Sequence, residues 1–297
     1  MNATRRFYFL FGILFLAVSA RSAQLSLLDD LNRTINLSSP AQRIVSLAPS
    51  ITETLFAVGA GDQVVGVTDY CNFPEGAREK TRVGGVVNHS VETIISLMPD
   101  LIILSMEGNV REDFNKLLSF GIPVFVTNPR SLAGIHKSIV DIGVLTGHSE
   151  EAAQLVVGLK AREDSVAQRV GTDKKRILFI VSLQPLIVVG GKSFLAELID
   201  RAGGLNVAAG SPSTFPTYSR ESVVKENPEF LFVMSDVVAD VNQLVTLYPE
   251  WKGIEAVRTG NIHRVDADIV SRPGPRAVDG LETLFLFFTE TLNETHR

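Results

Sequence analysis

SVETIISLMPDLIIL, at residues 90–104, has a counterpart 129 positions further along the chain, SRESVVKENPEFLFV at residues 219–233. Both read serine, any residue, glutamate, a small hydroxyl residue and two β-branched residues. Proline, an acid and four apolar residues follow after three variable positions. Serine caps the start of a helix, and proline ends the helix before a buried strand. The repeat predicts two similar lobes, each with one glutamate, Glu92 or Glu221, in the first turn of a helix.

Apolar runs and helical patterns alternate around both copies. The first half has apolar runs at 43–48, 64–67, 101–104 and 122–126, with helical segments at 50–58 and 111–119. The second half repeats this order, with apolar runs at 176–182, 230–233 and 262–265 and helical segments at 194–201 and 276–292. Continuous apolar strands between helices are typical of parallel sheets covered on both faces. We expect an α/β fold with an N-terminal lobe over 43–148 and a C-terminal lobe over 171–297.

The segment between the lobes, residues 149–170, reads as a helix rather than a flexible linker. Ser149 is followed by Glu150 and Glu151, and acids favour the positive end of a helix dipole. Apolar residues then recur at helical spacing, without a glycine-rich or proline-rich stretch. A linking helix is rigid, so we expect only a small closure of the lobes.

The first 23 residues read as a signal peptide. A basic start at Arg5 and Arg6 precedes an apolar run at 7–18, which is too short to span a bilayer. Small residues predict cleavage near Ala20 or Ala23 and export to the periplasm. Residues 24–42 then read as an N-terminal tail. The only cysteine, Cys71, lies far from the cleavage site, so we expect no lipid anchor.

The charge and the missing motifs narrow the function. The formal net charge is −5, and loss of Arg5 and Arg6 leaves −7, which argues against nucleic acid as a partner. The five histidines lack metal-ligand spacing, and the sequence contains no nucleophile elbow, phosphate loop or dinucleotide motif. We expect no catalysis, no metal and no cofactor of its own. The alternative, an enzyme that holds a metal or cluster between two lobes, would need clustered cysteines or histidines.

Candidate ligand-binding residues lie in loops after the expected strands. In open α/β sheets, ligands sit beyond the carboxyl ends of the strands. Tyr70 and Phe73 follow the second strand, and Phe215 lies in the matching loop of the second half. Asp268 and Arg272 follow the last strand, and an arginine offers a rigid fork of donors to ligand acceptors.

Three stretches together resemble the helical-backbone class of substrate-binding proteins of ABC importers, most closely its cobalamin-binding group. They are RIVSLAPSITETLFAVGAGDQVVGVTDYCNFP at 43–74, the paired Ser-x-Glu segments, and SRPGPR at 271–276. The resemblance implies a receptor that binds cobalamin, a corrinoid, between its lobes and delivers it to a membrane permease–ATPase complex. It maps ligand contacts to Tyr70, Phe73, Phe215, Asp268 and Arg272.

The same resemblance implies that Glu92 and Glu221 dock onto arginines of the permease. We expect a monomer. We also expect no tryptophans in its cleft, because the positions that match the cleft tryptophans of the cobalamin-binding group are Val86, Ser105 and Phe215. Haem and ferric siderophores therefore stay open as ligands beside cobalamin. A sensor that meets a signalling partner is a further alternative, although it would not need both glutamates.

Overall fold

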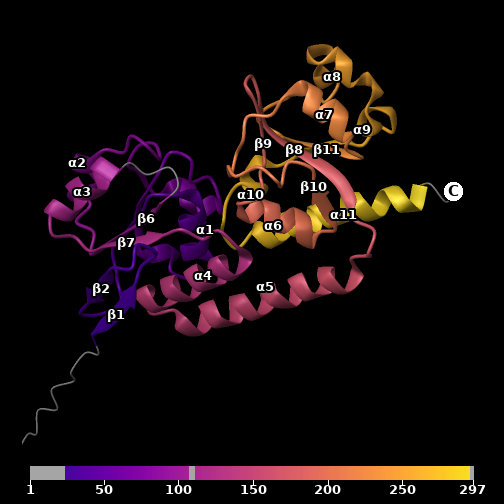
Figure 1. Ribbon diagram of the computed structural model, residues 1–297. Coiled ribbons are helices and arrows are strands. Elements are labelled where there is room, and N and C mark those ends of the chain that lie inside the picture. The colour runs from indigo at the N-terminus through magenta and orange to yellow at the C-terminus, as the bar shows by residue number, and fades with distance from the viewer. Residues whose placement is uncertain (1–23, 107–110, 295–297) are drawn as a thin grey trace, which may run out of the picture.

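A computed structural model describes residues 24–106 and 111–294, so the predicted signal peptide lies outside the described residues. Two α/β lobes lie side by side, and α5 (Ser149–Arg169) runs along the base of both (Figure 1). This helix occupies the segment in which the sequence predicts the linking helix. The last long helix of each lobe, α4 (Leu132–Thr146) or α11 (Ala277–Glu294), packs against α5.

The N-terminal lobe is built on five parallel strands in the order β5-β4-β3-β6-β7. Their bounds are β3 (Ile44–Ser46), β4 (Val64–Val67), β5 (Thr81–Arg82), β6 (Leu101–Ser105) and β7 (Val124–Thr127). The helices are α1 (Pro49–Ala57), α2 (Val91–Ser96), α3 (Arg111–Ser119) and α4, with short 3₁₀ turns η1 (Gly61–Gln63) and η2 (Glu75–Glu79). β3 lies at the centre, between β4 and β6.

The C-terminal lobe repeats this arrangement, with parallel strands in the order β10-β8-β11-β12 and β9 added antiparallel to β8. Its strands are β8 (Lys175–Leu183), β9 (Leu186–Val188), β10 (Gly204–Asn206), β11 (Phe230–Met234) and β12 (Ile262–Val265). Its helices are α6 (Phe194–Arg201), α7 (Arg220–Glu226), α8 (Gln243–Leu247), η3 (Pro249–Gly253), α9 (Glu255–Arg258), α10 (Ala267–Val270) and α11. The order β10-β8-β11-β12 corresponds to β4-β3-β6-β7, and the predicted pair of similar α/β lobes is confirmed.

The repeated segment folds in the same way in both lobes. Ser90 caps α2 by accepting a hydrogen bond from the Thr93 amide at 3.1 Å, and Ser219 caps α7 through the Ser222 amide at 3.0 Å. In each copy the proline follows the helix, and the apolar run becomes a fully buried strand, β6 or β11. The serine, the proline and the apolar run therefore set the local structure, while the glutamates stay on the surface.

Alternate residues of each strand face different helices, which explains the continuous apolar runs. In β6, Ile102 packs towards α2 and α3, whereas Ile103 faces α1 and α4. In β11, Leu231 faces the side covered by α7, α8 and α9, whereas Phe232 faces α6 and α11. The clusters around Ile103 and Phe232 merge through α5 into one hydrophobic core that crosses the lobe boundary.

The segment expected as an N-terminal tail is ordered instead, so that prediction was wrong. β1 (Leu25–Leu28) and β2 (Thr34–Leu37) form an antiparallel hairpin. β2 alternates between exposed and buried positions, and its buried Ile35 and Leu37 join the large core. The Asp30 amide also donates to the Val126 carbonyl at 3.0 Å. Apolar burial and this contact fix the hairpin to the N-terminal lobe.

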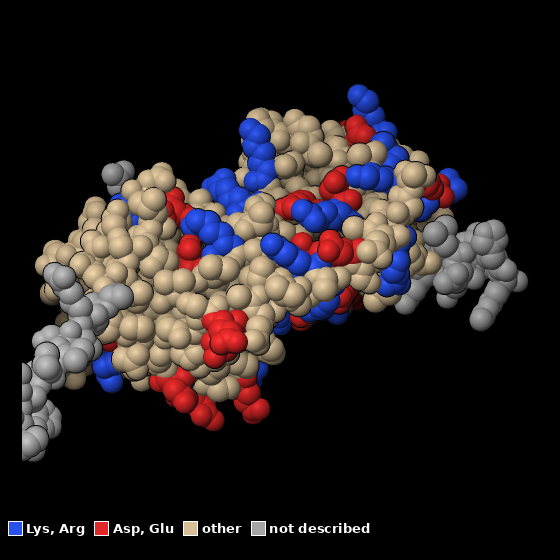
Figure 2. Space-filling model, turned by 90° about the horizontal axis from the view of Figure 1, so that it is seen from below, with Lys and Arg blue, Asp and Glu red and all other residues tan. Residues whose placement is uncertain are grey.

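On the face that carries α5, acidic and basic side chains are interspersed rather than separated into fields of one sign (Figure 2). Ion pairs account for part of this pattern, for example Arg162 with Glu282. None of the helices within the described residues combines the length and the apolar character needed to cross a bilayer.

Candidate functional site

A cavity of about 450 Å³ lies between the lobes, at the carboxyl ends of the N-terminal strands. The N-terminal lobe lines it through the start of α1, the loop after β4, the loop after β5 and the end of β6. The C-terminal lobe contributes the turn after α10. The lining residues are Ala48, Pro49, Ser50, Tyr70, Val86, Val87, Asn88, Ser105, Ser271, Arg272 and Pro273. Cavities of this size hold small-molecule ligands, and their usual place in α/β proteins is this end of the strands.

Two of the five predicted ligand residues, Tyr70 and Arg272, line this cavity. Tyr70 is 61% exposed, so much of this residue is open to a ligand. A smaller neighbouring cavity of about 40 Å³ contains Phe215, which is 46% exposed. Ser271 lines both cavities, so they are adjacent parts of one inter-lobe cleft. The structure therefore brings Tyr70, Phe215 and Arg272 to the same cleft.

Arg272 is buried, and its terminal nitrogens already bind protein acceptors. Nη1 donates to Glu53 Oε1 at 2.9 Å and to Asn72 Oδ1 at 2.8 Å. Nη2 donates to Asp268 Oδ1 at 2.5 Å and to the Tyr70 carbonyl at 3.3 Å. A ligand would have to displace one of these bonds to reach the terminal nitrogens. The observed role of Arg272 is to tie the cleft-lining loop after β4 to the C-terminal lobe.

Glu53 on α1 is the centre of this network. It is only 3% exposed and accepts from Arg272 and from Arg276, whose Nε and Nη2 lie at 2.8 Å and 2.7 Å. These hydrogen bonds raise the pKa of Arg276. Because a buried carboxylate is costly without partners, two guanidinium groups from the C-terminal lobe are needed to balance it. We call Glu53, Asn72, Asp268, Arg272 and Arg276 the Glu53 cluster.

Of the remaining predicted residues, Asp268 belongs to this cluster and Phe73 packs against it. The guanidinium of Arg276 lies 4.2 Å from the centre of the Phe73 ring, a cation–π contact. Asp268 accepts from Asn72 Nδ2 at 2.7 Å as well as from Arg272. The loop after β4 is therefore fixed to the C-terminal lobe at several points, and Tyr70 is held at the edge of the cleft. Direct ligand contacts of Phe73 and Asp268 stay predictions.

Cys71, next to Tyr70, points into the N-terminal lobe. Its side chain is fully buried, and its Sγ lies 3.1 Å from both the Thr52 and the Thr68 hydroxyl oxygens. The thiol therefore helps to anchor the loop and does not face the cleft.

The glutamates of the repeat lie on α2 and α7, and both helices occupy the side of the molecule away from α5 (Figure 1). The Glu92 side chain is 82% exposed, with Lys116 Nζ 3.8 Å from its Oε1. A hydrogen bond from the backbone, together with Lys116, lowers the pKa of Glu92. Glu221 is also exposed and lines a separate surface cavity with Tyr218 and Tyr248. Two exposed carboxylates, one on each lobe, are thus available to a partner.

Sequence reasoning missed Glu53 and Asn72. One signal for Glu53 was present, because it is the only charged residue of the segment PSITETLFA, which forms α1. An acid within such an apolar helix is usually buried and paired. Its partners, 219 and 223 positions away, could not be read from that pattern.

The model of the family described as periplasmic binding protein matches residues 44–269, most of the described chain. This chain belongs to the periplasmic binding protein family. The matched region includes the parallel sheets of both lobes, α5 and Asp268, and it ends just before Arg272.

This periplasmic binding protein is similar to a vitamin B12-binding protein of Vibrio campbellii, with 29% identity over 82% of this chain and 87% of the relative. Among solved structures, the vitamin B12-binding protein BtuF of Vibrio cholerae is 27% identical, with a TM-score of 0.75 over 84% of this chain and 96% of that chain. The heme-binding protein RhuT of Roseiflexus sp. RS-1 is also 27% identical, with a TM-score of 0.76 over 84% and 98%. Similar relatives thus bind different ligands on one fold.

Proposed function

We propose that this chain is the exported, monomeric substrate-binding protein of an ABC importer and that it binds cobalamin in the cleft between its lobes. The observation that carries this proposal is the inter-lobe cavity at the carboxyl ends of the strands, with Tyr70 and Phe215 exposed along the cleft. Large corrinoid rings suit a wide cleft with aromatic edges and few polar groups. The vitamin B12-binding relatives support the same ligand. In this proposal the chain has no catalytic activity.

A panel of ligands tests the proposal. We expect isothermal titration calorimetry of the mature protein to show tight, one-to-one binding of cyanocobalamin and no heat with ferric siderophores. Tyr70→Ala should weaken cyanocobalamin binding by about 1 kcal/mol or more, because a large aromatic contact is lost. Clear heat with haemin or a ferric siderophore but none with cyanocobalamin would reject the corrinoid assignment.

Haem is the second candidate ligand because of one observation. Tyr70 offers an exposed phenol at the cleft, and a tyrosine phenolate is one of the axial ligands that proteins use for haem iron. Tyr70→Phe separates the two ligands, since it removes the phenol and keeps the ring. For a haem receptor this change would abolish the tyrosinate signature in the visible spectrum. For a cobalamin receptor it would leave the affinity nearly unchanged.

We further propose that Glu92 and Glu221 dock the loaded protein onto basic residues of the permease in the membrane. Their equivalent places on α2 and α7 and their exposure support this role. The double change Glu92→Ala with Glu221→Ala should leave ligand affinity intact and abolish uptake. A matched control, Glu150→Ala with Asp164→Ala, removes two exposed carboxylates of α5, on the other side of the molecule (Figure 1), and should leave uptake normal. Normal uptake in the first double variant would contradict the docking role.

A further inference from the structure

Two cations line the cleft from opposite lobes. Arg130 follows β7 in the N-terminal lobe, and Lys192 precedes α6 in the C-terminal lobe. Both line the small cavity that contains Phe215, and both line an adjoining cavity of about 490 Å³ beside α6. They therefore lie at one end of the cleft. Ser271 lines both the small cavity and the cavity of about 450 Å³ that contains Tyr70, so that larger cavity forms the other end.

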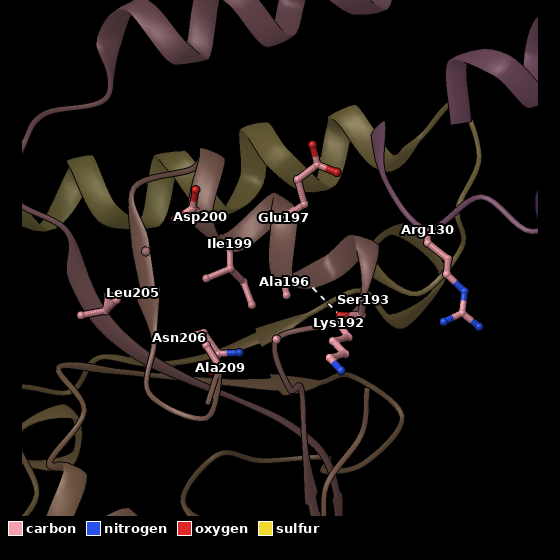
Figure 3. Close-up of a pocket in the computed structure, with 12 residues that line it drawn as sticks. Arg130, Lys192, Ser193, Ala196, Glu197, Ile199, Asp200, Leu205, Asn206 and Ala209 are labelled. Carbon is pink, nitrogen blue, oxygen red and sulfur yellow. Dashed lines mark hydrogen bonds between the residues drawn. The ribbon is translucent and has the colours of Figure 1, made fainter. Parts of the chain in front are cut away.

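Neither cation has an ionic partner within the described part of the chain. Across residues 24–106 and 111–294, no ion pair or hydrogen bond involves the charged end of Arg130 or Lys192, and both residues are exposed. Figure 3 shows their charged ends extending away from the carboxylate of Glu197. That carboxylate already accepts from the Leu132 amide and from Arg201 Nε, each at 2.8 Å.

Among the described residues, the acidic side chains Asp268, Glu53 and Asp200 near the cleft bind other partners. Asp268 accepts from Arg272 and from Asn72, and Glu53 accepts from Arg272 and Arg276. Asp200, which lines the cavity beside α6, pairs with Lys174. Lys192 and Arg130 therefore leave a local excess of positive charge in a chain whose net charge is −5. Such an excess attracts an anionic group of a ligand.

We propose that Arg130 and Lys192 form an anion-recognising end of the cleft, which binds an anionic oxygen group carried by the ligand. The inference rests on the proposed function and deepens it. In a cobalamin the group is the phosphodiester of the nucleotide loop, and in haem it is a propionate carboxylate. The arginine supplies a planar fork for two oxygens, and the lysine supplies a mobile point charge from the other lobe.

The test compares ligands with and without the anionic group. Wild-type protein and the variant Arg130→Gln with Lys192→Gln are titrated with cyanocobalamin and with dicyanocobinamide, which lacks the nucleotide loop and its phosphodiester. Haemin and haemin dimethyl ester form the second arm. We expect the variant to bind the anionic member of one pair about tenfold more weakly and its counterpart within twofold of wild type. The wild-type affinity for the anionic member should fall as salt is raised.

A charge-matched control removes two exposed cations that line none of these cavities, Lys160 and Lys252, by the same change to glutamine. This control should bind every ligand as wild type does. Unchanged affinity of the Arg130 and Lys192 variant, or an equal loss for both members of a pair, overturns the anion site and leaves the proposed function intact. If wild-type protein binds neither corrinoids nor haemin, the proposed function fails and the anion site fails with it.

Discussion

The Glu53 cluster and the Arg162 cluster are both built from guanidinium and carboxylate groups, but they differ in burial. The Arg162 cluster consists of Arg162 on α5 with Asp279 and Glu282 on α11, at distances of 2.6 Å and 2.5 Å. Its three side chains are 40%, 39% and 38% exposed, whereas the Glu53 side chain is 2% exposed. Water can replace a lost partner in the exposed cluster and not in the buried one. Similar contacts should therefore contribute very differently to stability.

The largest effect is expected for Glu53→Gln. This change keeps the shape of the side chain but leaves Arg272 and Arg276 without their shared anion in a buried place. We expect the free energy of unfolding to fall by about 3–5 kcal/mol, measured by urea denaturation. Glu92→Gln, the same change at an exposed glutamate, should stay within about 0.5 kcal/mol of wild type. A loss below about 1 kcal/mol for Glu53→Gln would show that burial does not make the Glu53 cluster contribute more to stability than the Arg162 cluster.

A smaller effect is expected for Arg162→Met, because its partners remain hydrated. We predict a loss of about 1 kcal/mol at pH 7. Hydrogen bonds from Arg162 lower the pKa of Glu282, so this carboxyl stabilises the fold above its unfolded pKa of about 4.3. The contribution is lost as the pH falls below that value. Urea denaturation should therefore show a smaller difference between variant and wild type at pH 3 than at pH 7, and an equal difference at both would contradict the ionic origin.

The smallest effect on stability is expected for the double variant Arg130→Gln with Lys192→Gln. Both cations are exposed and unpaired within the described residues, so their removal breaks no contact of the fold. The free energy of unfolding should change by less than about 0.5 kcal/mol. A loss of 2 kcal/mol or more in urea denaturation would place these cations among the structural charges, together with the Glu53 cluster.

The repeated segment shows how much of the fold local sequence can predict. Ser90 and Ser219 cap their helices, and each proline is followed by a buried strand, because caps and breaks act within a few residues. The repeat also predicted that the two lobes are similar, and the matching strand orders confirm this prediction. The hairpin over β1 and β2 was missed, because four-residue strands give a weak alternating pattern.

The cleft was harder to predict than the fold. Tyr70 and Phe215 followed from the rule that ligands lie beyond strand ends, and both reach the cleft. Arg272, predicted as a ligand contact, lies beside the cavity, but its terminal nitrogens bind Glu53 and other protein acceptors. That pairing joins residues 219 positions apart and depends on how the lobes meet, which no local pattern encodes. Arg130 and Lys192 were missed because charge alone does not distinguish a cleft residue from an ordinary surface residue.

The burial of Cys71 has a practical consequence. It is the only cysteine in the sequence, and its thiol is fully covered by the N-terminal lobe. A cysteine introduced in place of the exposed Phe215 would thus be the one accessible thiol of the folded protein. A fluorescent dye attached there would sit at the cleft, and its emission would change as the cleft fills. The fold therefore offers a ready scaffold for an optical biosensor that reports its own ligand in real time.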